Sequence, residues 1–372
     1  MSQNFDVLVI GAGIAGASVA AHLAEHMRVC ILEMEDRPGY HSTSRSAATY
    51  EPNYGPPPIL ALTRASRSFF DAPLRGFADR PLLNPHETLF FMPEGQEEAA
   101  EALLAKSSGL IDLSAAQAKA KFPPLRAGYA RRTLSDRGTA DIDVDLLHQG
   151  YLKLFKRRGG HLRLKTEVLS LERNGGQWTA GDYHAPVIVN AAGAWADVVA
   201  ARAGAAPLGL QPKRRSIGVV PAPEGLDMAA LPMAVDVAET WYMKPQSGKF
   251  LISSADATPV EPHDAFADDM AIAEGIERFQ IATEIEVTRV ESTWGGLRSF
   301  FPDGVPVCGF DAKMKGFFWL AGQGGYGIQS APALSALAAA QVLGKPVPQH
   351  LRDHGVDAAS LSPQRFKTGA TS

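Results

Sequence analysis

Short, continuous apolar runs recur along the chain, of the kind that fill parallel strands buried on both faces of a sheet. They cover residues 5–10, 29–32, 187–192 and 317–321. Between the first two runs, Ala17, Val19, Ala20 and Leu23 are spaced for one buried face of a helix. The order strand, helix, strand predicts an α/β fold with a parallel sheet at its centre.

A glycine triplet joins the first apolar run to this helix. Gly11 allows a tight turn, Gly13 lets the backbone approach a pyrophosphate, and Gly16 lets the helix pack close to the strand. The pyrophosphate of a dinucleotide would then sit on the free N–H groups at the positive end of the helix dipole. Glu33 ends the second strand, where a carboxylate accepts the hydroxyls of an adenosine ribose and repels a 2′-phosphate. Glycines turn many ordinary loops, but strand, helix and acid in register predict a dinucleotide site that does not take NADP.

Less continuous patterns fill the rest of the chain. Strand patterns lie at residues 87–92 and 162–168, and helical patterns at residues 60–70, 97–107 and 146–155. The Pro-broken, alternating stretch 211–288 is typical of an antiparallel sheet. The chain between the second and third apolar strands is too long for a connection within one nucleotide-binding domain, which indicates an inserted domain. We predict a discontinuous Rossmann-like domain and an interleaved α+β domain on an antiparallel sheet, divided as residues 1–80, 140–206 and 300–372 against residues 81–139 and 207–299.

Several single positions carry structural expectations. Asp143 or Asp145 should cap the helix that contains residues 146–155. We interpret His148, on the same helix, as structural because no partner motif surrounds it. Asn174, Gly175 and Gly176 predict a hairpin turn.

Two further stretches have chemistry that the pattern alone leaves open. His41–Ala48 brings several hydroxyls and one arginine next to the nucleotide turn. It could hold pyrophosphate oxygens and the ribityl chain of a flavin, or it could be a polar loop that caps the next helix. Gly322–Gly327 follows the last apolar strand and precedes an Ala-rich helix, so a second helix N-terminus could face a ligand, or the glycines could serve the turn alone.

Composition narrows the possible functions. Of 372 residues, 45% are hydrophobic and 20% are charged, as in ordinary globular proteins. The net charge is 36 − 40 = −4 with no basic block, which argues against nucleic-acid binding. Cys30 and Cys308 lie in apolar runs and should be buried free thiols. No apolar run reaches the ~18 residues of a membrane span, and a strand from Phe5 leaves no room for a signal peptide. We expect a cytoplasmic location, with peripheral contact at the inner face of the membrane left open.

Together these motifs resemble the flavin amine oxidoreductases of the D-amino-acid oxidase and glycine oxidase type. The resemblance covers nearly the whole chain, and it is most specific to the bacterial FAD-dependent D-arginine dehydrogenase subgroup. Strings that carry the subgroup resemblance are Gly39–Thr43, Arg45–Ala48, Ala140–Asp143, Leu210–Ser216 and Gly295–Phe300.

The resemblance implies non-covalent FAD and a small amino acid as substrate. It places the substrate carboxylate against Arg298 and Arg215 with help from Tyr242, Tyr54 on a loop that closes the site, and Gln329 near flavin and substrate. An arginine fork suits a carboxylate, although a surface or phosphate-facing arginine is the other interpretation of these residues. The expected FAD contacts are Gly11, Gly13, Ile14, Ala15, Gly16, Glu33, Ser42, Thr43, Arg45, Ser46, Ala47, Ala48, Val168, Ala192, Gly193, Trp195, Arg298, Gly322, Gly324, Gly325, Tyr326, Gly327 and Ile328.

The chain departs from the subgroup in the part of the pocket that recognises a guanidinium. The glutamate that reaches the substrate guanidinium in those enzymes aligns with Thr88, and Glu87 next to it should point to the other face of its strand. A histidine near the flavin aligns with Thr49, and a threonine aligns with Glu51. We therefore expect D-arginine to be a poor substrate, with neutral D-amino acids, or one that presents a charge to Glu51, oxidised faster.

The sequence thus favours FAD-dependent oxidative deamination of a D-amino acid, in which flavin N5 takes a hydride from Cα and the imine hydrolyses to a 2-oxo acid and ammonia. A second hypothesis keeps the fold but oxidises a secondary amine, glycine or a 2-hydroxy acid. A third is a flavoprotein module that binds without turnover or modifies RNA within a larger enzyme. The acidic charge and the candidate carboxylate clamp weigh against the third. A dehydrogenase would also need an electron acceptor such as a quinone or a carrier.

Overall fold

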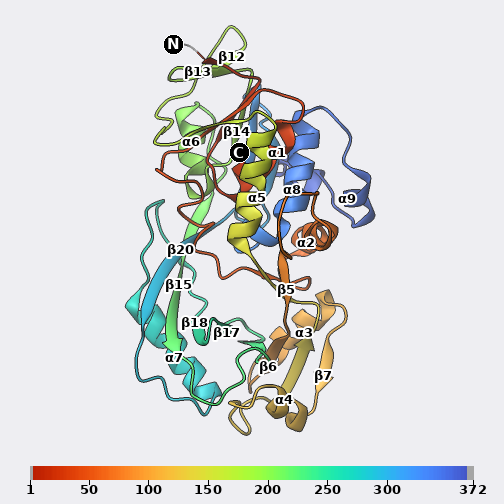
Figure 1. Cartoon of the computed structure of the whole chain (residues 1–372), viewed down its shortest axis with the longest axis vertical. Coiled ribbons are helices and arrows are strands. Elements are labelled where there is room, and N and C mark those ends of the chain that lie inside the picture. The colour runs from red at the N-terminus through yellow and green to blue at the C-terminus, as the bar shows by residue number, and fades with distance from the viewer. Residues whose placement is uncertain (1–2, 367–372) are drawn as a thin grey trace, which may run out of the picture.

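A six-stranded sheet forms the frame of the upper lobe in Figure 1, in the order β10-β3-β2-β14-β22-β21. Its strands are β2 (Val7–Ile10), β3 (Val29–Leu32), β10 (His161–Arg163), β14 (Val187–Asn190), β21 (Val307–Phe310) and β22 (Phe317–Ala321). All neighbouring strands are parallel except β21 and β22. The structure is a computed structural model, and it describes residues 3–366.

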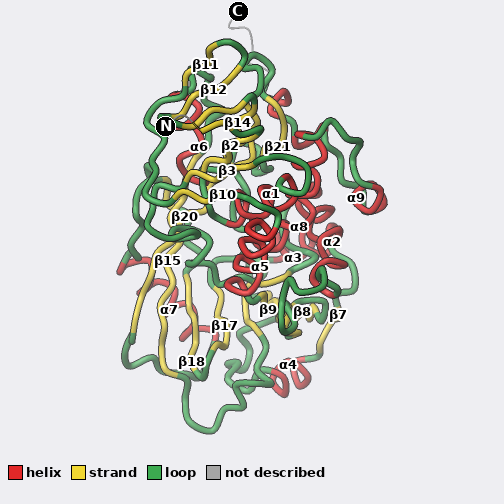
Figure 2. The backbone as a smooth tube through the Cα atoms, turned by 45° about the horizontal axis from the view of Figure 1, so that its top comes forward, coloured by secondary structure: helices red, strands yellow, loops and turns green. Residues whose placement is uncertain are grey.

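Helices cover this sheet and form its larger core. Figure 2 shows α1, α5 and α8 together on one side of the central strands. The helices of this layer are α1 (Ile14–Leu23), α2 (Pro57–Asp71), α5 (Val144–Arg157) and α8 (Gly327–Val342). A second hydrophobic cluster contains the buried side chains of Trp178 and Trp319. Some of its other side chains come from α6 (Ala196–Arg202). A small sheet adds β1 (Gln3–Asn4), β11 (Glu172–Asn174), β12 (Gln177–Ala180) and β13 (Tyr183–Ala185).

A nine-stranded sheet forms the lower lobe in Figure 1. Its strands are β6 (Thr88–Met92), β7 (Ile111–Leu113), β8 (Arg132–Asp136), β15 (Gln211–Pro221), β16 (Met233–Asp236), β17 (Tyr242–Gln246), β18 (Lys249–Ser253), β19 (Thr258–Pro259) and β20 (Ser292–Phe300). Only β6 and β16 pair in parallel among these strands of residues 3–366. The helices beside it are α3 (Glu97–Lys106), α4 (Ala115–Lys121) and α7 (Asp269–Ala282).

Two features connect the lobes. The long strands β15 and β20 pair over nine residues each and run from the lower lobe toward the upper one (Figure 1). A small sheet of β4 (Thr49–Tyr50), β9 (Ala140–Ile142) and β5 (Leu83–Pro85) lies where the chain passes between them. The chain continues beyond α8 into α9 (Gln349–Asp353).

Within residues 3–366, no helix has both the length and the apolar character that a membrane span requires.

Most predicted elements are confirmed, and one strand prediction is wrong. The strand expected at residues 162–168 ends at Arg163, because the backbone N–H groups of Lys165 and Thr166 turn back to the carbonyls of Glu35 and Glu33. The turn carries Lys165 at a φ of 52°. This departure from the sheet brings Val168 to a cavity beside Glu33.

The single-residue expectations also have clear outcomes. Asp143 is the helix cap, since its carboxylate accepts a hydrogen bond from the Leu146 N–H (2.9 Å). His148 is buried and bonded to the Ala12 carbonyl (2.9 Å), which agrees with a structural role. The helix predicted from residue 60 begins earlier, at Pro57, because proline is well suited to the first turn of a helix. The hairpin at residues 174–176 and the buried free thiols of Cys30 and Cys308 are confirmed.

Candidate active site

Three adjoining cavities run along the carboxyl ends of the parallel strands and into the nine-stranded sheet. The first and second share Gly13, Ser42, Thr43 and Gly193. The second and third share Ser46, Ala47, Arg215, Arg298 and Gly325. We call them the nucleotide, central and substrate cavities. Because shared residues join them in series, they form one elongated site.

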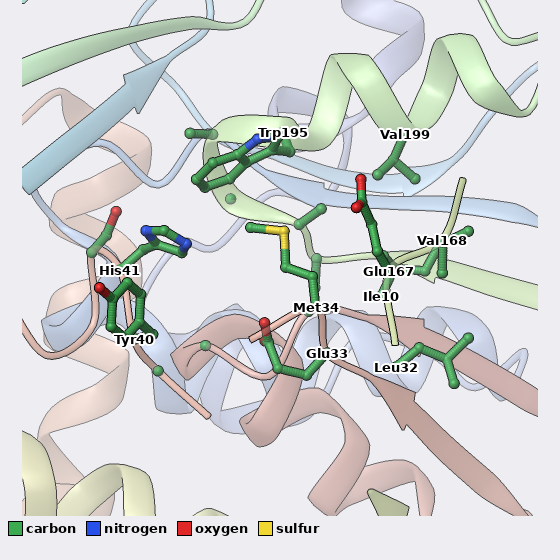
Figure 3. A pocket seen from close by; sticks show the side chains of 18 of the residues that line it. Ile10, Leu32, Glu33, Met34, Tyr40, His41, Glu167, Val168, Trp195 and Val199 are labelled. Carbon is green, nitrogen blue, oxygen red and sulfur yellow. The ribbon is translucent and has the colours of Figure 1, made fainter. Parts of the chain in front are cut away.

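The nucleotide cavity is built by the strand ends that the glycine motif predicts. Figure 3 shows Glu33, His41, Trp195 and Val168 around it. His41 Nε2 lies 2.9 Å from a Glu35 carboxylate oxygen, and its ring packs 4.6 Å from that of Trp195. Expected contacts that line this cavity are Gly11, Gly13, Glu33, Ser42, Thr43, Val168, Ala192, Gly193 and Trp195.

The glycine turn has the close packing that the sequence predicts. A Cβ on Gly11 would lie 2.6 Å from the Ala191 carbonyl oxygen, and Gly11 has a φ of 99°. A Cβ on Gly16 would lie 1.9 Å from the Gly11 carbonyl oxygen, so Gly16 packs the helix against the turn and lines none of the three cavities. Glu33 accepts the Ala12 N–H (2.6 Å), which fixes its carboxylate at the cavity.

The central cavity collects the two stretches whose roles the pattern left open. The hydroxyl-rich segment supplies Ser42, Thr43, Arg45, Ser46 and Ala47, and the second glycine turn supplies Gly322–Gly325. The other expected contacts that line this cavity are Ile14, Ala15, Gly193, Arg298, Gly327 and Ile328. Both stretches therefore lie at the site, as the flavin interpretation requires.

Arg45 holds a different position from the phosphate-facing cation that the stretch suggested. Its guanidinium is paired with Asp264 and donates to the carbonyls of Ala265 (2.8 Å) and Gly295 (3.3 Å). Tyr40 also donates to Asp264 (3.0 Å). Arg45 lines the central cavity, but its charge is already neutralised by the loop that it holds.

Two guanidiniums face the substrate cavity from adjacent strands. In the β15–β20 ladder Lys213 pairs with Arg298, so Arg215 and Arg298 lie diagonally on one face of the sheet. Arg215 Nε donates to the Asp256 carbonyl (2.7 Å), while the nearest Asp256 carboxylate oxygen is 3.9 Å away. Burial and then the charge of Arg298 lower the pKa of Arg215. Among residues 3–366, Arg298 has no carboxylate within ion-pair distance. The Glu239 carboxylate of the same cavity attracts both guanidiniums from beyond ion-pair distance.

The other residues that the resemblance places near the substrate also lie at this cavity. Tyr242, Tyr54 and Gln329 all line it. The Tyr242 hydroxyl and the Gln329 Nε2 are buried without a hydrogen-bond partner in the described part of the chain. Burial, followed by the charge of Glu239, raises the pKa of Tyr54, which opposes its phenolate and favours a donor role. Tyr326 packs on Tyr54 with ring centroids 5.0 Å apart and lines none of the three cavities.

The alignment-based departures have distinct positions. Thr88 is fully buried, bonded to Thr139 (3.2 Å), and does not line the substrate cavity. Glu87 is paired with Lys121 (2.6 Å) and is likewise absent from the cavity lining. Glu51 does line it, is only 8% exposed, and accepts a hydrogen bond from Thr49 (2.7 Å). Burial raises the pKa of Glu51.

Sequence reasoning missed several residues of the substrate cavity. Glu239 lies on a turn with a φ of 55°, and Asp236 organises this turn by accepting the Thr240 (2.6 Å) and Trp241 (3.1 Å) N–H groups. Aspartate is frequent in turns, so Asp236 was a local signal that could have been used. The other missed residues of this cavity are Phe90, Met233, Val235, Lys244 and Ala255, which carry no motif.

The site fits FAD on its own geometry. The glycine cradle at Gly11 leaves no room for a side chain, and Glu33 is held at the nucleotide end. At the central cavity, Gln323 has a buried Nε2 without a hydrogen-bond partner among the described residues. Glu33 would hold the adenosine ribose, the glycine turn the pyrophosphate, and Gln323 the flavin part. Residues 3–366 contain no cluster of metal-ligating side chains.

Comparison with known proteins agrees with this geometry. Residues 6–341 match the family model DAO, described as FAD dependent oxidoreductase. A glycine oxidase of Geobacillus kaustophilus is 24% identical over 360 residues, which covers 91% of this chain and 93% of that protein. The crystal structure of a glycine oxidase from the same species superposes with a TM-score of 0.82 at 22% identity, over 98% of this chain and 99% of that one.

A second solved structure shares the fold at lower identity. It is an L-proline dehydrogenase from P. horikoshii, with a TM-score of 0.82 at 18% identity over 99% of each chain. The mixed α/β architecture is thus common to enzymes named as oxidases and as dehydrogenases. With the family match spanning nearly the whole chain, the protein belongs to the DAO family of FAD-dependent oxidoreductases.

Proposed function

We propose that this protein catalyses the oxidative deamination of a D-amino acid other than D-arginine. The observation that carries the proposal is the pair Arg215 and Arg298, two guanidiniums on one sheet face with no carboxylate within 3.5 Å in the described chain. A bidentate carboxylate is the usual partner of such a fork. The unpartnered Tyr242 hydroxyl in the same cavity adds a neutral donor for it.

The side chains of this cavity would prepare the substrate in three ways. Arg298, Arg215 and Tyr242 hold the carboxylate and so fix the position of Cα. The two cationic charges lower the pKa of the substrate ammonium, so that its deprotonation needs no strong protein base. Tyr54, kept neutral by burial, can donate a hydrogen bond but is a poor base. When FAD is bound, it supplies the acceptor for the substrate hydride.

The selection against D-arginine is supported by the cavity lining. A guanidinium finds no carboxylate at Thr88, which is buried and bonded elsewhere, or at Glu87, which is paired with Lys121. An unpaired buried charge costs several kcal/mol. The remaining wall is apolar at Phe90 and Val235 and carries two carboxylates, Glu51 and Glu239, of which Glu51 is buried.

The decisive experiment mixes the purified yellow protein anaerobically with single compounds and follows the loss of flavin absorbance. The panel contains both enantiomers of alanine, norleucine, lysine and arginine, together with glycine, N-methylglycine, proline and lactate. Fast bleaching by a D-amino acid, well above its L-enantiomer and D-arginine, is expected. Fastest reduction by D-arginine would refute the selectivity, and bleaching by none of the amino acids would refute the reaction.

The runner-up is oxidation of glycine or of a secondary amine. The relative named as a glycine oxidase and the fold shared with an L-proline dehydrogenase favour including it. In the same panel, glycine, N-methylglycine or proline would then bleach the flavin faster than every primary D-amino acid. Repeating the best reaction in air and with a quinone distinguishes an oxidase from a dehydrogenase.

A further inference from the structure

Lys244 is a buried cation that the carboxylate clamp does not use. It lies on β17, two residues after Tyr242 and therefore on the same face of the strand, and its side chain is 6% exposed. It lines the substrate cavity and also an outer cavity beside His86 and Asp141. A buried ammonium is costly unless it is paired and hydrogen-bonded. The hydrogen-bond and ion-pair partners of Lys244 therefore indicate its role.

The Lys244 ammonium has two partners, and both belong to other parts of the chain. It donates to the Ala47 carbonyl (2.6 Å) and forms an ion pair with Asp141 (2.8 Å). Asp141 lies on β9 opposite Thr49 of β4, and His86 Nε2 is 3.3 Å from its carboxylate. Lys244 thus ties the nine-stranded sheet to residues 47–49 and to the strand that supports them.

Residues 45–49 lie between the central cavity and the substrate cavity. Arg45, Ser46 and Ala47 line the central cavity, and residues 46–49 line the substrate cavity. Other contacts also hold this segment. The Arg45 guanidinium pairs with Asp264 and donates to the Gly295 carbonyl of β20, whose Trp294 donates to the Arg45 carbonyl. Ile142 donates to the Ala48 carbonyl. The Lys244 contact adds the link between Ala47, in the middle of the segment, and β17.

From these contacts we infer that Lys244 is a positioning residue of the active site. Through the Ala47 carbonyl it sets where residues 46–49 lie against a substrate whose carboxylate is held by Arg298 and Arg215. Removing it should change the alignment of the reacting carbon more than the strength of carboxylate binding. Asp141 pairs with the Lys244 ammonium and so fixes the direction in which the Lys244 side chain points.

The test compares Lys244→Met, Lys244→Arg and Asp141→Asn, each loaded with FAD, in anaerobic reduction by the best amino acid of the panel. Because a misplacement of about 1 Å can cost about 100-fold in rate, Lys244→Met should reduce its flavin about 10–100-fold more slowly at saturating substrate. Its dissociation constant for substrate and for the non-reducing carboxylate benzoate should change less than about threefold. Lys244→Arg can keep both contacts and should recover most of the rate, and Asp141→Asn should be intermediate.

The control is Lys249→Met, since Lys249 lies on the neighbouring strand β18, is half-exposed and pairs with Glu291 outside the cavities. Its rate should equal that of the parent protein. An unchanged rate in Lys244→Met, or a loss confined to substrate affinity, would overturn the inference, as would a failure of Lys244→Arg to recover the rate.

Only the kinetic part of this test rests on the proposed function. Hydrogen–deuterium exchange of the peptide over residues 44–50, in FAD-loaded protein without substrate, tests the tie directly. Lys244→Met should exchange faster there than the parent, while Lys249→Met should not, and equal exchange in all three would reject the tie. If no amino acid bleaches the parent flavin, the proposed function fails while this measurement still decides the inference.

Discussion

Replacing Arg298 by lysine separates the contribution of the bidentate guanidinium from the contribution of its positive charge. The two side chains carry the same charge, but lysine is a point donor that cannot make the two parallel bonds of a guanidinium to a carboxylate. Arg298 has no protein carboxylate to hold in the described chain, whereas Arg215 already donates to the Asp256 carbonyl. The larger loss is therefore expected at Arg298.

The magnitude follows from one charge-assisted hydrogen bond, which contributes about 1.5–3 kcal/mol. At about 1.4 kcal/mol per tenfold change, Arg298→Lys should weaken substrate and benzoate binding about 10–150-fold. Arg215→Lys should weaken it less. Anaerobic titration of the flavin spectrum gives both dissociation constants, and stopped-flow reduction gives the rate at saturation.

Arg214→Lys is the matched control, because Arg214 is the neighbour of Arg215 on the same strand, lines none of the three cavities and pairs with Asp268 (2.6 Å). It should bind both carboxylates as the parent does. Equal affinity of Arg298→Lys and the parent for substrate and benzoate would refute the carboxylate clamp. A loss of FAD without loss of carboxylate affinity would instead assign Arg298 to the cofactor.

Three further outcomes test separate parts of the site. Gly325→Ala would place a Cβ 3.1 Å from Arg298 Nη1, so substrate affinity should fall by about 1 kcal/mol or more, about fivefold, with FAD still bound; unchanged affinity would contradict the close approach. Glu33→Gln removes the charge from the acceptor of the Ala12 N–H, so fluorescence titration of the apoprotein should show about tenfold weaker FAD binding or worse, and equal binding would exclude Glu33 from the nucleotide site. Burial raises the pKa of Glu51 above its ordinary value of 4.5, so the ionised carboxylate destabilises the fold as pH rises above that value; Glu51→Gln should therefore raise the melting temperature more at pH 8 than at pH 5, and equal shifts would contradict the burial argument.

Local patterns were sufficient for the parallel sheet and the glycine turn. The runs at β2, β3, β14 and β22 are apolar on both faces, which leaves few alternatives for their placement. The strand at residues 162–168 was overextended because its alternation continues past the point where Lys165 turns back toward Glu35. That turn depends on a tertiary contact with the loop that follows β3, which periodicity does not encode.

The site was predictable only where a residue carries a motif. Arg298, Arg215 and Tyr242 followed from a family resemblance, and the structure brings all three to one cavity. Lys244 and Glu239 had no such signal, because their roles arise from contacts with residues more than a hundred positions away or from a left-handed turn. Arg45 was predicted as a cofactor contact and lines the central cavity, whereas its ion pair with Asp264 carried no signal in the sequence.

The β15–β20 ladder has a consequence for how this enzyme could acquire other substrates. Both guanidiniums are carried by backbones that hydrogen-bond to each other along the ladder, so their spacing is insensitive to changes in the surrounding loops. The wall that would contact a substrate side chain comes from Phe90, Met233 and Val235 of the sheet and from two other segments, the turn at Glu239 and residues 46–54. Libraries confined to these two segments should therefore alter the preferred side chain while the requirement for an α-carboxylate persists.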